Sequence, residues 1–309
     1  MGSNGKRTEP SGRPHAKPEA IPLHVLGSDG DDGLAFELNS LEEMTRAARA
    51  GYPHRHSFYQ VLYLTAGAGC HVIDFVPDPV TPPCLYFVSP GQVHFWELEE
   101  PTAGKVLRFA PEFLLFASAG ESPLDHLAFF HTTGEPPRLS LEAGDAALFS
   151  ELIGGLEEEY LHAAFGRTSV LRAYLHVLLV QIQRRWRTRT QAVEDRASSL
   201  VRRFKKMLSE RVLVDRTVSA YAEALGLSAG HLSDTVKAVT QRTAGALIRE
   251  EVTTEAKRLL AHSDLSVAEI AYRLHFEDPS YFGRFFRRES GASPGGFRNS
   301  FREKYQTYR

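Results

Sequence analysis

The sequence of 309 residues contains few of the features that mark secreted, membrane or redox proteins. It has only two cysteines, Cys70 and Cys84, which are not spaced as C-x-x-C, so we expect no disulfide framework. The apolar run at 177–180 ends in Gln181 and is much shorter than the roughly 18 residues that a membrane span needs. Residues 1–20 are polar and lack the apolar core of a secretory signal, so we expect a disordered arm there. The expected location is therefore the cytoplasm, without a membrane partner.

Motifs of the common enzyme chemistries are also missing. The chain has no Ser-His-Asp order, no P-loop and no dinucleotide-binding glycine motif. We therefore expect no enzyme activity and no cofactor. One enzymatic alternative stays open, a metal-dependent dioxygenase or isomerase, because histidines cluster in the N-terminal half.

The net charge of −2 hides an asymmetry between the two ends of the chain. Residues 196–309 contain 20 Lys and Arg against 13 Asp and Glu, an excess of +7. The rest of the chain contains 16 basic and 25 acidic residues, an excess of −9. A basic C-terminal segment suits a polyanion such as nucleic acid, although many solvated helical domains carry a similar excess.

Short apolar runs separated by turn residues follow the arm. Residues 59–65 and 85–88 are apolar, residues 71–75 alternate between apolar and polar, and glycine and proline occupy the breaks. This pattern predicts antiparallel strands of a small barrel or sandwich.

The apolar spacing changes to three and four residues between 141 and 186, which predicts two amphipathic helices joined near residues 165–167. These helices have two possible roles, covering the barrel and forming a dimer interface. The polar segment that follows, residues 188–198, is expected to be a linker.

An internal repeat in the last hundred residues carries the functional prediction. Residues 218–227 align with residues 267–276 at an offset of 49, and beyond the turn the offset becomes 50. Each copy has a short helical pattern with a central alanine, a tight turn and a second helical pattern, which is the helix-turn-helix arrangement. Gly226 fits a left-handed turn conformation, and His275 occupies the matching position in the second copy, where we expect a tolerated substitution.

The second copy has clear helix boundaries. Ser266 and Glu269 form a capping box, and Asp278 followed by Pro279 begins the second helix. Three phenylalanines form the inward stripe of that helix: Phe282, Phe285 and Phe286. The residues expected to face DNA are Asp278, Ser280, Tyr281, Gly283, Arg284, Arg287 and Arg288.

Arginines give this second helix its expected roles. Arg284 is placed for the major groove, where an arginine can donate two hydrogen bonds to guanine, and Arg287 and Arg288 are expected to contact phosphates. A single arginine on an arbitrary helix is more often a solvated surface charge, but three together on this helix favour DNA contact.

The first copy has a thinner and less basic surface on its second helix, at about residues 228–239. Asp234 aligns with Arg284 and would repel phosphate, although it can accept a hydrogen bond from a cytosine amine. We expect this helix to contribute less affinity. Its residues expected to face DNA are Ser228, Ala229, Gly230, His231, Ser233, Asp234 and Lys237.

Residues 204–301 resemble the AraC/XylS family of transcription regulators. The resemblance rests on residues 265–271, on residues 276–282 with Arg284 and Phe286, and on residues 291–294 leading to 297–298. It implies that a helix at 244–262 places both helix-turn-helix units on one face of DNA, about one helical turn apart. The sequence departs from the family at His275, where glycine is usual, and at Asp234 and Val236, where a basic residue and Phe are frequent. These departures affect the expected base preference and not the expected fold.

The N-terminal half resembles the cupin barrels that precede this DNA-binding unit in many family members. The resemblance rests on His54, His56 and Gln60, on glycines 67 and 69, and on residues 89–94. His54, His56 and His94 could converge on a metal, but Gln60 stands where the usual fourth ligand is Glu, so we expect no metal. We expect instead a pocket for a small organic effector, with barrel packing as the alternative role of these side chains. The expected pocket residues are His54, His56, Tyr59, Gln60, His94, Trp96 and Arg108.

The sequence thus predicts an α+β protein of two domains. Residues 21–187 are expected to form a cupin-like barrel with two covering helices, which binds the effector and dimerises, and residues 199–305 an all-helical domain with two helix-turn-helix units. The expected function is a transcription regulator, with activation favoured by the resemblance. The expected partners are double-stranded DNA, a small organic effector, a second copy of the chain and RNA polymerase.

Overall fold

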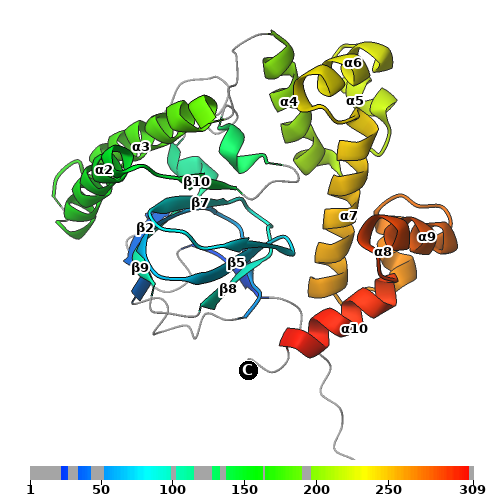
Figure 1. The fold of residues 1–309 in the computed structure, drawn as a ribbon, viewed down its shortest axis with the longest axis horizontal. Coiled ribbons are helices and arrows are strands. Elements are labelled where there is room, and N and C mark those ends of the chain that lie inside the picture. The colour runs from blue at the N-terminus through cyan, green and yellow to red at the C-terminus, as the bar shows by residue number, and fades with distance from the viewer. Residues whose placement is uncertain are drawn as a thin grey trace, which may run out of the picture.

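The computed structural model describes residues 22–26, 34–42, 52–98, 102–114, 127–132, 137–162, 164–189 and 196–305. A β-rich N-terminal domain lies beside an all-helical C-terminal domain, so the predicted α+β class with two domains is confirmed (Figure 1). The predicted arm, residues 1–20, and the middle of the predicted linker, residues 190–195, lie outside the described residues. None of the described helices is long and apolar enough to cross a membrane.

Two antiparallel sheets form the body of the N-terminal domain. The five-stranded sheet has the order β10-β7-β4-β9-β2 and the three-stranded sheet the order β6-β5-β8. A short parallel pair joins β1 to β3. Within the described residues, no continuous strand pairing closes the two larger sheets into a barrel. The strand bounds are β1 Leu23–His24, β2 Phe36–Ser40, β3 Arg55–His56, β4 Tyr59–Ala66, β5 Gly69–Ile73, β6 Val76–Pro79, β7 Cys84–Val88, β8 His94–Leu98, β9 Ala103–Phe109 and β10 Arg138–Ser140.

Strand β4 shows how the layers form. Successive side chains of a strand point to opposite faces, so Leu62 and Leu64 enter the core between the two sheets while Val61 and Tyr63 enter the core beneath the helices. Both faces are therefore buried, which explains the continuous apolar run in the sequence. Gly104 of β9 lies so close to this strand that a Cβ atom there would be 2.0 Å from the Tyr63 carbonyl oxygen.

The two predicted covering helices are α2 (Ala143–Leu161) and α3 (Arg167–Arg189). Both pack on the outer face of the five-stranded sheet (Figure 1). Two short 3-10 helices, η1 (Pro111–Leu114) and η3 (Ala128–Phe130), fill the remaining edge of this core. Helix α3 continues to Arg189 and α4 begins at Arg196, so helix occupies both ends of the predicted linker. Polar composition did not indicate this because the exposed ends of helices are polar as well.

The C-terminal domain consists of seven helices that share one core. The predicted repeat is visible in their caps, because residues offset by 49 or 50 play the same role. Thr217 and Ser266 cap the first helix of each unit, and Ser228 and Asp278 cap the second. The helix bounds are α4 Arg196–Arg211, α5 Val218–Ala224, α6 Ala229–Thr240, α7 Ala244–His262, α8 Val267–Arg273, α9 Pro279–Ser290 and α10 Pro294–Tyr305.

The turns of the two units match as well. Gly226 has φ 72° and His275 has φ 58°, so the histidine does adopt the left-handed conformation expected at the glycine position. At the ends of the second helices, Gln241 and Gly291 are both left-handed C-caps.

Candidate DNA-binding surface and effector pocket

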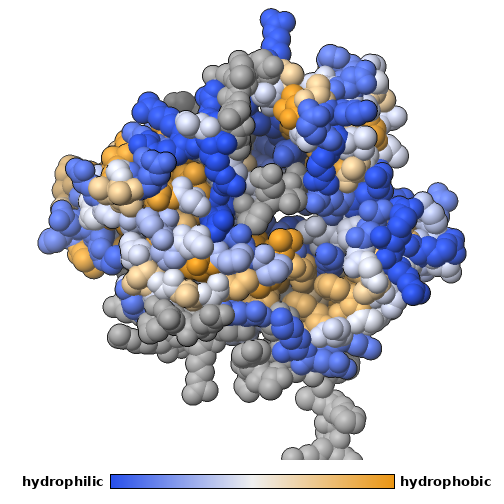
Figure 2. Space-filling view, in the orientation of Figure 1, coloured by the Kyte–Doolittle hydropathy of each residue, from blue (hydrophilic) through white to orange (hydrophobic). Residues whose placement is uncertain are grey.

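Helix α9 presents the most basic surface of the second helix-turn-helix unit. Asp278 accepts hydrogen bonds from the backbone N–H groups of Ser280 and Tyr281, which starts the helix with Pro279 in its first turn. Phe282, Phe285 and Phe286 are buried, as predicted, so the remaining faces of α9 point to solvent. Hydrophilic side chains dominate the right-hand face in Figure 2, where Figure 1 places α9.

The three arginines of α9 differ in how strongly the protein holds them. The Arg284 side chain is 70% exposed and its guanidinium lies 3.9 Å from Asp278, a weak contact that DNA can replace. Arg288 is held by Glu289, with its Nε 2.8 Å and its Nη2 2.7 Å from the carboxylate. Arg287 is exposed at the end of the helix. The two predicted phosphate contacts are therefore not equivalent.

Helix α6 presents the corresponding surface of the first unit. Ser228 accepts a hydrogen bond from the His231 N–H and thereby caps the helix, while Leu232 and Val236 are buried. Of the predicted residues, Ala229 and Ser233 are partly buried, and the others are exposed: Ser228, Gly230, His231, Asp234 and Lys237. The structure thus leaves most of the predicted face of α6 open.

Helix α7 joins the two units, and its bounds agree with the predicted 244–262. Its 19 residues correspond to about 28 Å at 1.5 Å per residue, close to the roughly 34 Å of one turn of B-DNA. Arg216, which no sequence pattern indicated, adds a second connection between the units besides α7. Its guanidinium lies 4.0 Å from the centre of the Phe276 ring and donates a hydrogen bond to the His275 carbonyl oxygen.

Four histidines of the N-terminal domain form a close group, here called the imidazole cluster: His56, His71 and His94 are buried, and His54 is partly buried. His71 Nε2 and His94 Nδ1 are 3.0 Å apart, and the ring centres of His54 and His56 lie 4.3 Å and 5.1 Å from that of His94. The His71 ring stacks on Trp96 at 3.7 Å. Sequence reasoning missed His71, because its strand position indicated only a packing residue.

Burial keeps the imidazole cluster neutral. Desolvation lowers the pKa of His54 to about 4 and that of His56 to about 3, and it lowers the pKa values of His71 and His94 well below 6.5. Three ring nitrogens are buried without a hydrogen-bond partner: His56 Nε2, His71 Nδ1 and His94 Nε2. Buried polar atoms are rarely left unpaired in proteins, so these nitrogens are suited to a polar ligand.

Two further predicted pocket residues lie on the same side as the cluster. Gln60 is buried and pairs in register with Arg108 on the neighbouring strand. Both therefore have the same orientation as Leu62 and Val106, which belong to the core between the two sheets. The Arg108 Nη1 donates a hydrogen bond to Glu37 at 3.1 Å. Of the seven predicted residues, His54, His56, His94 and Trp96 are thus brought together with His71, and Gln60 and Arg108 point into the core between the two sheets to which Trp96 belongs.

Tyr59 is the exception and points away from the imidazole cluster. It precedes Gln60 on β4 and so points to the opposite face of the strand, where its ring packs against Phe130 at 4.6 Å and Phe109 at 5.7 Å. The alternation of side chains along a strand is the physical reason. Within the described residues, no group of three or more His, Cys, Asp or Glu side chains has the arrangement needed to hold a metal ion.

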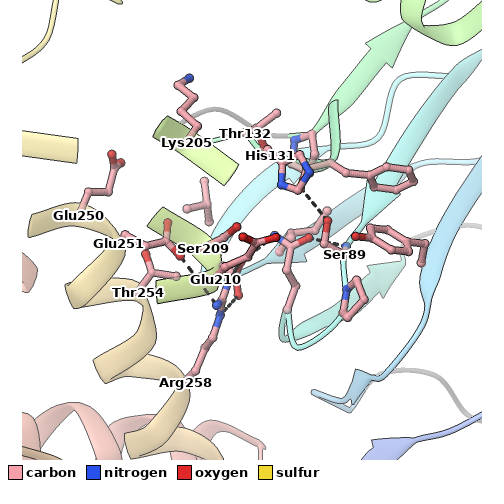
Figure 3. A pocket seen from close by; sticks show the side chains of 18 of the residues that line it. Ser89, His131, Thr132, Lys205, Ser209, Glu210, Glu250, Glu251, Thr254 and Arg258 are labelled. Carbon is pink, nitrogen blue, oxygen red and sulfur yellow. Dashed lines mark hydrogen bonds and ion pairs between the residues drawn. The ribbon is translucent and has the colours of Figure 1, made fainter. Parts of the chain in front are cut away.

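A cavity of about 270 Å³ lies between the two domains. Tyr59, Ser89 and His131 line it from the N-terminal side, and Glu251 and Arg258 from helix α7 (Figure 3). Burial raises the pKa of Glu251 to about 7, although the nearby Arg258 opposes this shift. No sequence pattern predicted this cavity, because its walls come from segments far apart in the chain.

Comparison with known proteins agrees with this architecture. Residues 44–178 match the family described as AraC-like ligand binding domain, and residues 221–300 match a helix-turn-helix domain family. The transcriptional activator RhaS of Salmonella paratyphi A is 27% identical over 258 residues, which are 82% of this chain and 90% of the relative. RhaS of Escherichia coli O81 is 25% identical over 256 residues with the same coverage.

Among the solved structures to which the chain is similar is ToxT from Vibrio cholerae O395. It is 12% identical, with 85% of this chain and 97% of ToxT covered and a TM-score of 0.41. The C-terminal domain of the response regulator AraT from Geobacillus stearothermophilus is 28% identical, covering 34% of this chain and 88% of that domain with a TM-score of 0.32.

Proposed function

Because the chain belongs to the AraC family of DNA-binding transcription regulators, which are not enzymes, we propose that it activates transcription in response to a small organic effector bound by the N-terminal domain. The observation that carries the proposal is the joining of two capped helix-turn-helix units to a domain with a buried imidazole cluster. The RhaS relatives are activators by name, which supports activation here. An activator of this kind would contact RNA polymerase.

We assign the reading of base edges to Arg284 and the grip on phosphates to Arg287. Both side chains are exposed on α9, and Arg284 lies closer to the start of the helix, the end that enters the major groove in helix-turn-helix proteins. The weaker surface of α6 contributes mainly orientation, because Lys237 is its only Lys or Arg within the predicted set. We propose that the other residues predicted to face DNA also contact it, with the exception of Asp278. The role of Asp278 is to cap α9 and so to position the helix.

The effector is proposed to bind beside the imidazole cluster, with Gln60 and Arg108 in reach. Neutral imidazoles donate and accept hydrogen bonds, and an arginine binds a carboxylate well, so the pocket suits a polar or acidic organic molecule. Such a ligand changes DNA binding only if it binds one conformation of the protein more tightly than another.

We also propose that the active form is a homodimer built on α3. Val170, Tyr174 and Val177 recur at helical spacing and are 36%, 36% and 43% exposed, although their apolar side chains would favour burial. A second copy of α3 would cover them by symmetry. Sedimentation of the protein with Val177→Glu tests this, because a dimer of the parent and a monomer of the variant are expected.

The experiment that tests the function is genome-wide mapping of bound DNA followed by binding to the segments found. Affinity is expected to fall steeply with salt, because Lys and Arg side chains release counterions from the phosphates they neutralise. Binding that is absent at low salt, or indifferent to salt, would contradict the proposal.

A further inference from the structure

The tip of the hairpin between β5 and β6 has an unusual backbone. Its two central residues, Asp74 and Phe75, have φ values of 48° and 69°. Two-residue hairpin turns with two positive φ angles favour Asn-Gly or Asp-Gly, because glycine has no Cβ to clash. Phenylalanine at the second position is therefore strained, and strain of this kind is found where surrounding contacts hold the residue in place.

Contacts with the other domain hold both residues. The Asp74 carboxylate receives two hydrogen bonds from Arg258 of α7, 2.8 Å from Nε and 2.6 Å from Nη2. Both side chains are almost buried, at 13% and 14% exposure. Within the N-terminal domain, Gln92 Nε2 donates a hydrogen bond to the Asp74 carboxylate at 2.7 Å, and the Val93 N–H donates another at 3.2 Å. These two bonds orient the carboxylate toward Arg258. Figure 3 shows Arg258 reaching from α7 toward the strands.

Phe75 adds an apolar contact beside the ion pair. Its ring centre lies 5.3 Å from that of Phe297 and 5.2 Å from that of Phe301, both on α10. Val93 and Ala261 are buried in the same small cluster. The tip thus contacts α7 through a charge and α10 through an aromatic ring.

The tip is also close in sequence to the proposed effector site. His71 lies on β5 three residues before Asp74, and His94 directly follows Val93, which binds Asp74. Strand β5 and the segment before β8 therefore carry both residues of the imidazole cluster and residues that hold the contact with α7.

We propose that Asp74 and Phe75 form a docking tip, through which the N-terminal domain holds α7 and α10 and restrains the DNA-binding domain. Within its own hairpin, nothing offsets the backbone strain of Phe75. The contact of its ring with α10 does offset that strain. The residues of the N-terminal domain carry an excess of negative charge, and docking holds this domain beside the DNA-binding domain. The negative charge of the docked domain repels DNA phosphates. Loss of the tip is therefore expected to raise DNA affinity. This last step rests on the proposed function, whereas docking itself does not.

Two substitutions test the docking tip without disturbing the hairpin. Phe75→Gly removes the ring and suits the turn better than Phe, and Asp74→Asn removes the charge at a position where Asn accepts a positive φ. Asp145→Asn is the matched control, because it breaks a comparable ion pair with Arg185, at 2.7 Å, inside the N-terminal domain. Hydrogen exchange of the full-length variants reports docking in peptides from 255–262 and 297–304, and peptides from β4 report the integrity of the N-terminal domain.

Faster exchange in α7 and α10 is expected in both tip variants and not in the control, with β4 unchanged. Parent-like exchange in α7 and α10 of both tip variants would overturn the docking role. DNA affinity is measured with a short duplex of arbitrary sequence at low salt, and the tip variants are expected to bind at least about fivefold more tightly than the parent. Faster exchange with unchanged or weaker DNA binding would overturn the restraint. Failure of the parent to bind any DNA would contradict the proposed function, while hydrogen exchange would still decide docking.

Discussion

Replacement of Arg284 by alanine separates base reading from general attraction to DNA. The side chain is 70% exposed, and its protein contacts are the carboxylate of Asp278 at 3.9 Å and the ring of Tyr281 at 5.9 Å. An exposed ion pair contributes about 1 kcal/mol at most, so the arginine leaves these contacts at little cost when DNA arrives. Truncation should also leave α9 intact, because the buried phenylalanines and the Asp278 cap remain.

The magnitude follows from the hydrogen bonds that the guanidinium can make. A bidentate contact with guanine contributes about 1–3 kcal/mol to discrimination, so Arg284→Ala should weaken binding to the preferred site by roughly five- to 150-fold. Preference at one base pair should be lost. Arg287→Ala is the control for a phosphate contact, and it should weaken all sequences alike and lower the magnitude of the salt slope by about one. Arg288→Ala should have a smaller effect than Arg287→Ala, because Glu289 already holds Arg288.

The assay is competition binding against single-base variants of a site found by genome-wide mapping. Arg284→Ala should flatten the preference at one position, and Arg287→Ala should keep the whole profile. If Arg284→Ala lowers every affinity equally, this arginine only contacts phosphate. Base reading would then have to come from Ser280, from Gly283 or from the first unit's His231, Ser233 and Asp234.

Three further outcomes are expected. Folded His54 and His56 should each lower the free energy of unfolding by about 2 kcal/mol at pH 5, because the unfolded chain binds protons near pH 6.5 that these imidazoles, with pKa values of about 4 and about 3, do not bind. Glu251 acts in the opposite direction over the same range, because its pKa is raised to about 7, so the test compares the parent with His56→Gln. In denaturant titrations the parent should lose about 2 kcal/mol more than His56→Gln between about pH 7.5 and pH 5, and equal losses would disprove neutral burial of His56. A Cβ atom at Gly226 or at Gly230 would meet nothing within 4 Å, so only the backbone distinguishes the two positions. Gly226→Ala should destabilise the protein by about 1 kcal/mol because φ is 72°, whereas Gly230→Ala within α6 should stabilise it by about 0.5–1 kcal/mol. Stability changes of the same sign in thermal unfolding would refute this reasoning. His94→Ala should reduce the change in DNA affinity on adding the inducing compound and keep basal binding, and a parent-like response would move the effector away from the imidazole cluster.

Much of the C-terminal domain followed from the sequence, because its information is local and repeated. Caps such as Ser266 and Asp278, and an apolar spacing of three and four residues, determine where each helix begins and which face it buries. The repeat then predicted that His275 adopts the backbone of Gly226, which the φ values confirm. Helix-turn-helix units therefore need little knowledge of distant contacts to be recognised.

The N-terminal pocket was only partly predictable, because it depends on strand register. Residue type suggested that Tyr59 and Gln60 share a pocket, but adjacent strand residues face opposite sides and only Gln60 lies with the cluster. His71 joined the cluster through the pairing of β5 with β8, which sets it opposite Trp96. Pairings of this kind are decided by the packing of whole sheets.

The sequence by itself determined the family, the two helix-turn-helix units and the faces of their helices, because short-range periodicity and capping encode them. Only the tertiary structure decided how the two domains meet. Asp74 and Arg258 are 184 residues apart, and nothing in the sequence around either residue distinguishes it from a charged residue on an ordinary surface. Their pairing depends on the shape and position of two folded domains, so the contact that ties the N-terminal domain to the DNA-binding domain has no local signature in the chain.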